Sequence, residues 1–158
     1  MAIVLDTSVI IDCLLAHRPR HANAVKLANV LRERGEVALI PMNAFFEIVS
    51  AVSCDKRTSG APPKTGELEE LPCQQQLIPI DADFLRDYFF DPLNRGQLID
   101  LKGGDMVFVA VALRHDATLI TEDVKMGRVA RKLGVRVQSI TECLAVPGGP
   151  SARTDPAR

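Results

Sequence analysis

Short runs of consecutive apolar residues, separated by segments of helical length, constrain the fold of this chain more than any other feature. A run that is apolar at every position, without polar alternation, is typical of a strand covered on both faces. Because helices are expected between these runs, the sequence predicts an α/β domain of three layers around a mainly parallel five-stranded sheet. The five predicted strands are 2–5, 37–40, 77–80, 118–121 and 135–137.

Helical periodicity fills the intervals between the predicted strands. Pro41 is expected to open a helix, at a position where proline is tolerated because no N–H is needed. Glycines and prolines at 58–73 predict a loop, and the Pro-, Gly- and Ser-rich residues 147–158 predict a disordered tail after one folded domain at 1–146. The expected helices cover about 9–15, 20–34, 41–57, 81–90, 105–114, 125–133 and 141–146.

Charge, cysteine spacing and the N-terminal segment give little support for a strongly basic nucleic-acid-binding protein, a zinc protein, or a secreted or membrane protein. The formal net charge of the 158-residue chain is −1, so a nucleic-acid-binding protein of this composition would have to gather its basic residues into a patch. Two basic stretches, 18–34 and 125–136, could form such a patch, although solvated helix faces explain them more simply. The four cysteines match no zinc-binding spacing. The start lacks a signal peptide or membrane span, so the cytoplasm is the expected location.

Four carboxylates stand in places that otherwise disfavour charge. Segment 37–54 contains one charged residue, and so does segment 103–113; the other two acids follow predicted strands, one directly and one after a further acid. A buried carboxylate is costly unless it meets a partner or a metal ion. The four acids are Asp6, Glu47, Asp105 and Asp123.

Each of these acids also has a simpler explanation. Asp6 and Asp105 could be helix N-caps, Asp123 a turn residue, and Glu47 a residue on the solvent side of its helix. Taken together, acids from separate segments could instead meet at the carboxyl edge of the sheet, where parallel α/β folds form their sites. A hard divalent cation with oxygen ligands, such as Mg²⁺, would offset their repulsion.

Three blocks of sequence, IVLDTSVII, FFEIVS and GGDMVFVAVALRHDATLITED, occur in this order. In this order and spacing they resemble the PIN-domain ribonuclease family, and more narrowly the VapC-like toxins of type II toxin–antitoxin pairs. The resemblance covers about residues 1–145 and implies a three-layer α/β/α PIN-like domain. Two features depart from the family: Lys125 and Met126 replace a further acid or Asn and an aromatic residue, and segment 59–72 is long. Asp100 could compensate for the first departure.

The resemblance implies a function and a set of residue roles. It implies an endoribonuclease that uses Mg²⁺ or Mn²⁺ to hydrolyse RNA phosphodiester bonds, forms a homodimer, and is paired with a small antitoxin protein. Two alternatives stay open: an RNA-processing PIN nuclease without an antitoxin, and a non-catalytic PIN module that binds RNA or protein. The implied catalytic residues are Asp6, Glu47, Asp105 and Asp123, with Asp6, Asp105 and Asp123 as metal ligands and Thr7 and Thr121 in support.

Overall fold

The computed structural model describes residues 2–55, 71, 73–89 and 101–145 of the chain. Five strands form one sheet in the order β3-β2-β1-β4-β5, and every neighbouring pair is parallel. The α/β prediction is therefore confirmed, with an all-parallel rather than mainly parallel sheet in this part of the chain. The strands are β1 (Ala2–Leu5), β2 (Val37–Pro41), β3 (Gln74–Ile78), β4 (Thr118–Ile120) and β5 (Val137–Gln138).

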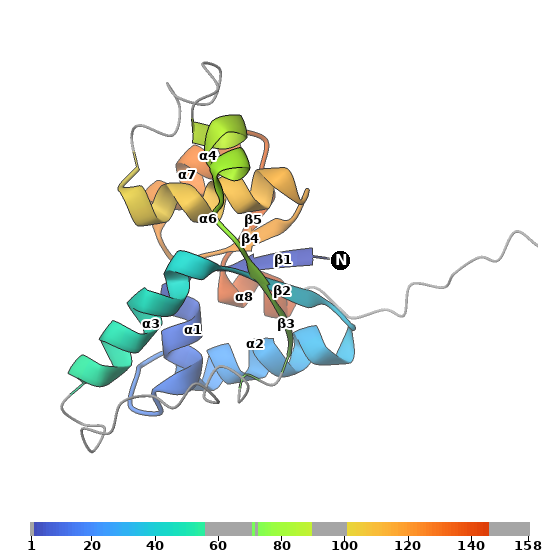
Figure 1. Ribbon diagram of the computed structural model, residues 1–158. Coiled ribbons are helices and arrows are strands. Elements are labelled where there is room, and N and C mark those ends of the chain that lie inside the picture. Colours follow the sequence, from blue (N-terminus) through green and yellow to red (C-terminus); the bar gives the residue numbers. More distant parts are fainter. Residues whose placement is uncertain (1, 56–70, 72, 90–100, 146–158) are drawn as a thin grey trace, which may run out of the picture.

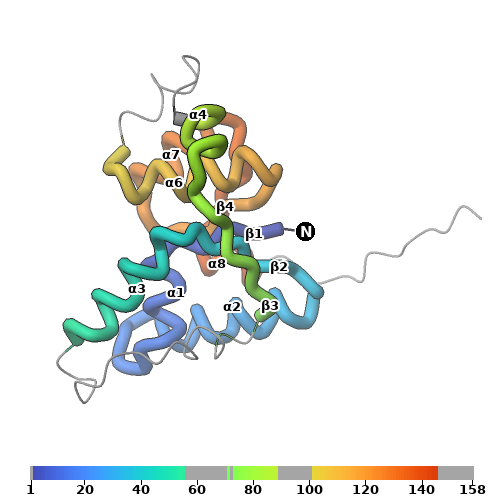
Figure 2. The backbone as a smooth tube through the Cα atoms, viewed as in Figure 1, coloured from blue at the N-terminus to red at the C-terminus, as the bar shows by residue number. Residues whose placement is uncertain are grey.

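Helices cover both faces of the sheet and give the predicted three layers. In Figure 1, α1, α2, α3 and α8 lie on one side of the sheet, and α4, α6 and α7 lie on the other. The tube in Figure 2 follows the same path and shows β3, which is an edge strand of the sheet, leading to α4. The helices are α1 (Thr7–Leu14), α2 (His21–Glu33), α3 (Met42–Cys54), α4 (Ala82–Phe89), α6 (Gly103–Arg114), α7 (Val124–Lys132) and α8 (Ile140–Ala145).

The centre of the domain explains why two segments are apolar at nearly every position. Strand β1 lies in the middle of the sheet, and Ile3, Val4 and Leu5 are all buried. Helix α6 packs across β1, β2 and β4, and its residues 108–112 are buried as one continuous block. A helix seated in this way has no solvent face along that block, so it lacks the amphipathic pattern of an outer helix.

The predicted boundaries were wrong at four strands, of which β4 ends at Ile120 instead of residue 121. Strand β3 begins at Gln74 and not at Leu77, because an edge strand exposed to solvent tolerates polar residues that a buried strand does not. Pro41 ends β2 with an extended backbone, so α3 begins one residue later than predicted. Strand β5 begins at Val137, while Val135 packs in the core just before it.

Several predictions concern parts of the chain outside the described residues. Asp100 and the predicted tail at 147–158 lie there, and so does most of the predicted loop at 58–73. Two residues at the end of that loop, Leu71 and Cys73, are described, and both are buried. In the described part of the chain, no helix has the length and apolar character needed to cross a membrane. All four cysteines are free thiols.

Candidate active site

The carboxyl ends of β1 and β4 bring two of the predicted site residues to one edge of the sheet. These strands are neighbours, and their register pairs Leu5 with Ile120. Asp6 therefore follows β1 directly opposite Thr121, which follows β4. Asp6 is also the N-cap of α1, and Asp123 is the N-cap of α7. This edge is where open parallel sheets form their ligand sites.

Asp6 is buried and is held by hydroxyl groups. Its Oδ2 accepts hydrogen bonds from Ser8 Oγ at 2.9 Å and Thr121 Oγ1 at 2.8 Å, while its Oδ1 accepts a longer one from Ser8 N at 3.3 Å. Thr121 Oγ1 in turn accepts a hydrogen bond from Asp123 N at 2.9 Å. The Thr121 hydroxyl thus links the segments that carry Asp6 and Asp123, and its own proton fixes the Asp6 carboxylate.

The N-cap role predicted for Asp6 is confirmed, and Asp123, which was predicted as a turn residue, is an N-cap as well. Asp6 accepts from Ser8 N as an N-cap does, and Asp123 Oδ1 accepts from Met126 N at 2.8 Å at the start of α7. Asp123 is thus a helix cap and not only a turn residue. In contrast, the interpretation of Asp105 as an N-cap is wrong, because Lys102 occupies that position and Asp105 lies in the first turn of α6.

Glu47 reaches the same edge from α3. Thr7 Oγ1 donates a hydrogen bond of 2.7 Å to Glu47 Oε2, which connects the start of α1 to the middle of α3. The other carboxylate oxygen, Oε1, lies so close to α6 that a Cβ added at Gly104 would be 2.6 Å away. Although Glu47 is on an exposed part of α3, its carboxylate is therefore fixed between α1 and α6.

The pKa of Asp105 responds to the charges of the other three acids. Burial raises the pKa of Asp105 above its usual 3.8, and the negative charges of Asp123, Asp6 and Glu47 raise it further, while Lys102 lowers it. In the described part of the chain, no salt bridge reaches any of these four carboxylates. The cluster therefore carries repulsion that the protein itself leaves largely uncompensated.

All four acids line one cavity of about 480 Å³. Thr7 and Ser8 contribute hydroxyl groups to its wall, and Glu122 adds a fifth carboxylate. The opposite charge comes from two arginines on the wall, Arg18 and Arg20. The cavity thus combines a carboxylate cluster with a basic rim, an arrangement suited to a divalent cation and an anionic ligand together.

The ligand chemistry of this cavity fits a hard divalent cation, although the carboxylates are not closed around one point. Within the described ranges, no three His, Cys, Asp or Glu side chains are grouped so that they could hold an ion. Their oxygens instead accept hydrogen bonds from hydroxyl and amide groups. Mg²⁺ keeps several of its waters and needs only one or two direct carboxylates, so a dispersed cluster of oxygen donors is compatible with it.

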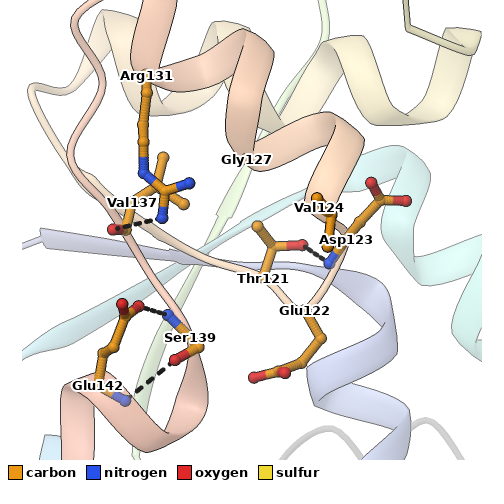
Figure 3. A pocket seen from close by; sticks show the side chains of 9 residues that line it. All are labelled: Thr121, Glu122, Asp123, Val124, Gly127, Arg131, Val137, Ser139 and Glu142. Atoms are coloured by element: carbon orange, nitrogen blue, oxygen red, sulfur yellow. Dashed lines mark hydrogen bonds between the residues drawn. The ribbon is translucent and has the colours of Figure 1, made fainter.

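A second, smaller cavity of about 250 Å³ shares Glu122 and Asp123 with the first. Figure 3 shows Arg131 at one end of it, donating to Val137 O at 3.5 Å, and the Asp123 carboxylate pointing away from Arg131. Ser139 and Glu142 exchange hydrogen bonds of 2.7 Å and 3.1 Å at the start of α8, which is a capping box. Because capping explains much of its polar lining, the larger cavity is the better candidate for chemistry.

One charged residue of this region was missed in the sequence. Asp12 lies in the last turn of α1 and is 1% exposed. Its Oδ1 accepts from Arg18 Nε at 2.7 Å and its Oδ2 from Arg20 Nε at 2.6 Å. The signal was available, since Asp12 interrupts the apolar run VIIDCLL just as Glu47 interrupts its own helix.

Comparison with known proteins agrees with this architecture. A chain of the VapBC2 structure from Rickettsia felis, bound to a promoter DNA fragment, is 16% identical with a TM-score of 0.58, over 88% of this chain and 98% of that one. A chain of FitAcB from Neisseria gonorrhoeae is 20% identical with a TM-score of 0.58, over 88% and 98%. A chain of VapBC-1 from nontypeable Haemophilus influenzae is 18% identical with a TM-score of 0.56, over 89% and 99%.

At these identities the structural likenesses establish the fold alone. The comparison with curated proteins found no match. The family model described as PIN domain, however, matches residues 3–132, which is most of the chain. The match runs from β1 through α7 and includes all four acids of the cavity. This chain therefore belongs to the PIN domain family.

Proposed function

We propose that this chain is an endoribonuclease that depends on Mg²⁺ or Mn²⁺ and hydrolyses RNA phosphodiester bonds in the acid-lined cavity. The observation that carries the proposal is the meeting of Asp6, Glu47, Asp105 and Asp123 around one cavity without a salt bridge among the described residues. Carboxylates kept together against their own repulsion support the proposal of a cation here, and PIN domains generally are nucleases.

In this proposal Asp6, Asp105 and Asp123 hold the metal, one or two of them directly and the rest through waters bound to the ion. A bound divalent ion would lower the pKa of a water and neutralise charge on the phosphate. The protein fixes the ligands: Thr121 donates to Asp6 Oδ2 and is itself held by Asp123 N. These hydrogen bonds restrain two ligands that follow different strands, which limits how far they move when an ion and substrate bind.

Glu47 is assigned to the attacking water. Thr7 occupies Oε2 of Glu47, and in the described part of the chain Oε1 accepts no hydrogen bond, so Oε1 can take the proton of that water. The water oxygen would then bond to phosphorus while the bond to the 3′ oxygen breaks, and the leaving 3′ oxygen takes up a proton. The products would be a 5′-phosphate and a 3′-hydroxyl end, and no protein nucleophile is required.

The partner we propose is a small antitoxin that binds next to the cavity. The similar solved structures carry the names of paired proteins, VapBC and FitAB. Beside Glu47 on α3, Phe46 is 71% exposed and Met42 is 46% exposed, which gives a partner an apolar contact close to the acids. An antitoxin could occupy the cavity with a Lys or Arg, and a homodimer could use other apolar faces.

The test is cleavage of a mixed RNA substrate by the purified protein with Mg²⁺ or Mn²⁺, and then with EDTA. We expect metal-dependent cutting that falls by at least about 100-fold in Asp6→Asn and in Asp105→Asn, because each change removes a ligand charge. Asp116→Asn is the matched control, since its side chain is 99% exposed and its φ of 46° suits asparagine. Full activity in both site variants would refute the assignment.

Two other functions make different predictions in the same experiment. An RNA-processing PIN nuclease would cut RNA with metal but would not bind a small protein encoded beside it. A non-catalytic PIN module would bind RNA or protein without cutting under any metal, and its melting temperature would not rise when Mn²⁺ is added. Cutting together with inhibition by a co-expressed neighbour would favour the toxin function over both.

A further inference from the structure

The turn between α1 and α2 presents two arginines in a fixed arrangement. Asp12, at 1% exposure, accepts a hydrogen bond from the Nε of Arg18 through one oxygen and from the Nε of Arg20 through the other. The carboxylate carries one negative charge and the guanidinium groups carry two positive charges. The cluster of these three residues therefore keeps a net positive charge.

The outer parts of both guanidinium groups remain available. The side chains of Arg18 and Arg20 are 37% and 42% exposed, although Asp12 is not. Their bonds to Asp12 use Nε, and within the described residues their terminal amino groups take no further hydrogen-bond acceptor. Both side chains line the same cavity as Asp6, Glu47, Asp105 and Asp123.

A polyanion that enters this cavity meets strong repulsion. Five carboxylates line the cavity, and a phosphate backbone carries one negative charge for each nucleotide. Arginine is suited to offset this repulsion, because its planar fork binds phosphate oxygens in pairs and is always charged. A guanidinium that is already held at Nε loses less freedom when its amino groups bind phosphate.

We propose that Arg18 and Arg20 bind the RNA backbone at a phosphate next to the one that is cut, and that Asp12 is a positioning residue for both. This inference rests on the proposed ribonuclease function and adds to it the contact that holds the substrate. The arginines stand on one wall of the cavity, so they fix which side of the acid cluster the strand passes.

A purely structural role for the cluster makes a different prediction. If the two arginines only close the turn between α1 and α2, their loss lowers the melting temperature and leaves RNA affinity unchanged at every salt concentration. A phosphate contact instead contributes to counterion release, so its loss flattens the dependence of affinity on salt. The salt dependence of binding therefore separates the two roles.

The experiment measures RNA binding by fluorescence anisotropy with a labelled single-stranded RNA in the Asp6→Asn background, where the RNA stays intact. Arg18→Gln and Arg20→Gln are first made singly, so that Asp12 always keeps one arginine. A triple variant combines both of these changes with Asp12→Asn, so that the buried Asp12 carboxylate is not left without a cation. Arg32→Gln is the control, because Arg32 is an exposed arginine near the end of α2 that does not line the cavity. Cleavage with Mg²⁺ is measured in parallel for each arginine variant with Asp6 intact.

We expect each single variant to weaken binding by roughly 3- to 10-fold at moderate salt and to reduce the slope of log K against log salt by about 0.7. The triple variant should reduce the slope by about 1.4, and Arg32→Gln should not change it. Unchanged affinity and slope in a protein that still cuts RNA would overturn this inference and leave the nuclease function standing. A wild-type protein that neither cuts nor binds RNA would instead refute the function itself.

Discussion

Helix α1 carries a buried aspartate at each end, and the two have opposite surroundings. Asp12, in the last turn, meets two arginines at 2.6 and 2.7 Å. Asp6, at the N-cap, meets hydroxyl and amide donors and adds to the repulsion that raises the pKa of Asp105. Both are nearly inaccessible to solvent, at 1% and 7% exposure.

The difference separates an acid whose charge is neutralised within the fold from an acid whose charge the fold leaves without a cation. A carboxylate with cations of its own is satisfied by folding, and its removal leaves those cations without their partner. A carboxylate placed among other carboxylates opposes folding, and the proposed function explains its presence by an ion or substrate that binds there. Burial alone would have ranked Asp12 above every residue of the proposed site.

Removing the charge of Asp12, which is paired with two arginines, should have the largest effect on stability. We expect Asp12→Ala to lower the free energy of unfolding by about 2–4 kcal/mol, because Arg18 and Arg20 lose a buried partner. Urea denaturation measures this change. The exposed pair of Asp83 with Arg86 supplies the control, since Asp83→Ala should cost less than about 0.5 kcal/mol. Equal losses of unfolding free energy in the two variants would show that the buried ion pairs of Asp12 stabilise the fold no more than the exposed pair does.

A smaller effect, on activity rather than folding, is expected at Gly104. A methyl group there would lie 2.6 Å from Glu47 Oε1, so Gly104→Ala should displace the Glu47 carboxylate and reduce cleavage by roughly 10-fold. Gly103→Ala is the matched control, because no atom lies within 4 Å of its added Cβ and the same helix gains the same alanine. Cleavage rates and melting temperatures of both variants should be measured. Equal activity in the two would show that the position of Glu47 is not critical.

The smallest effect is expected at Asp105, where removing the charge should raise stability, whereas at Asp12 it should lower stability. Asp105→Asn should stabilise the metal-free protein at neutral pH by about 1 kcal/mol or less, or ~2–4 °C in melting temperature, after allowance for partial exposure. The reason is that burial, and then its negative neighbours, raise the pKa of this carboxylate when the chain is folded. Destabilisation by Asp105→Asn in EDTA would contradict the picture of an uncompensated acid cluster.

The raised pKa of Asp105 also determines how the stability of the protein changes with pH. Because the folded pKa of Asp105 is higher than the usual 3.8, the folded chain binds the proton more tightly than the unfolded chain between those two values. The Asp105 contribution to stability therefore falls as pH rises through this window, and its full cost is present above the raised pKa. The gain from Asp105→Asn should vanish below about pH 3.8, which melting curves in EDTA at several pH values would show.

Patterns within short segments were enough to predict the layers of the fold. The apolar runs of β1, β2 and β4 and the unbroken apolar block of α6 are properties of a few consecutive residues, and central burial explains both. The polar residues Gln74–Gln76 of β3 could not be predicted by the same rule, since an edge strand needs no apolar pattern on its exposed side.

The sequence by itself determined where carboxylates stand in apolar segments and which of them follow strands. It did not determine what each carboxylate meets. Only the tertiary structure placed Arg18 and Arg20 on Asp12, Thr7 on Glu47, and Thr121 on Asp6 across 115 residues of chain. The physical reason is that the cost of a buried charge depends on the groups within a few ångströms of it, and those groups come from segments that folding alone brings together.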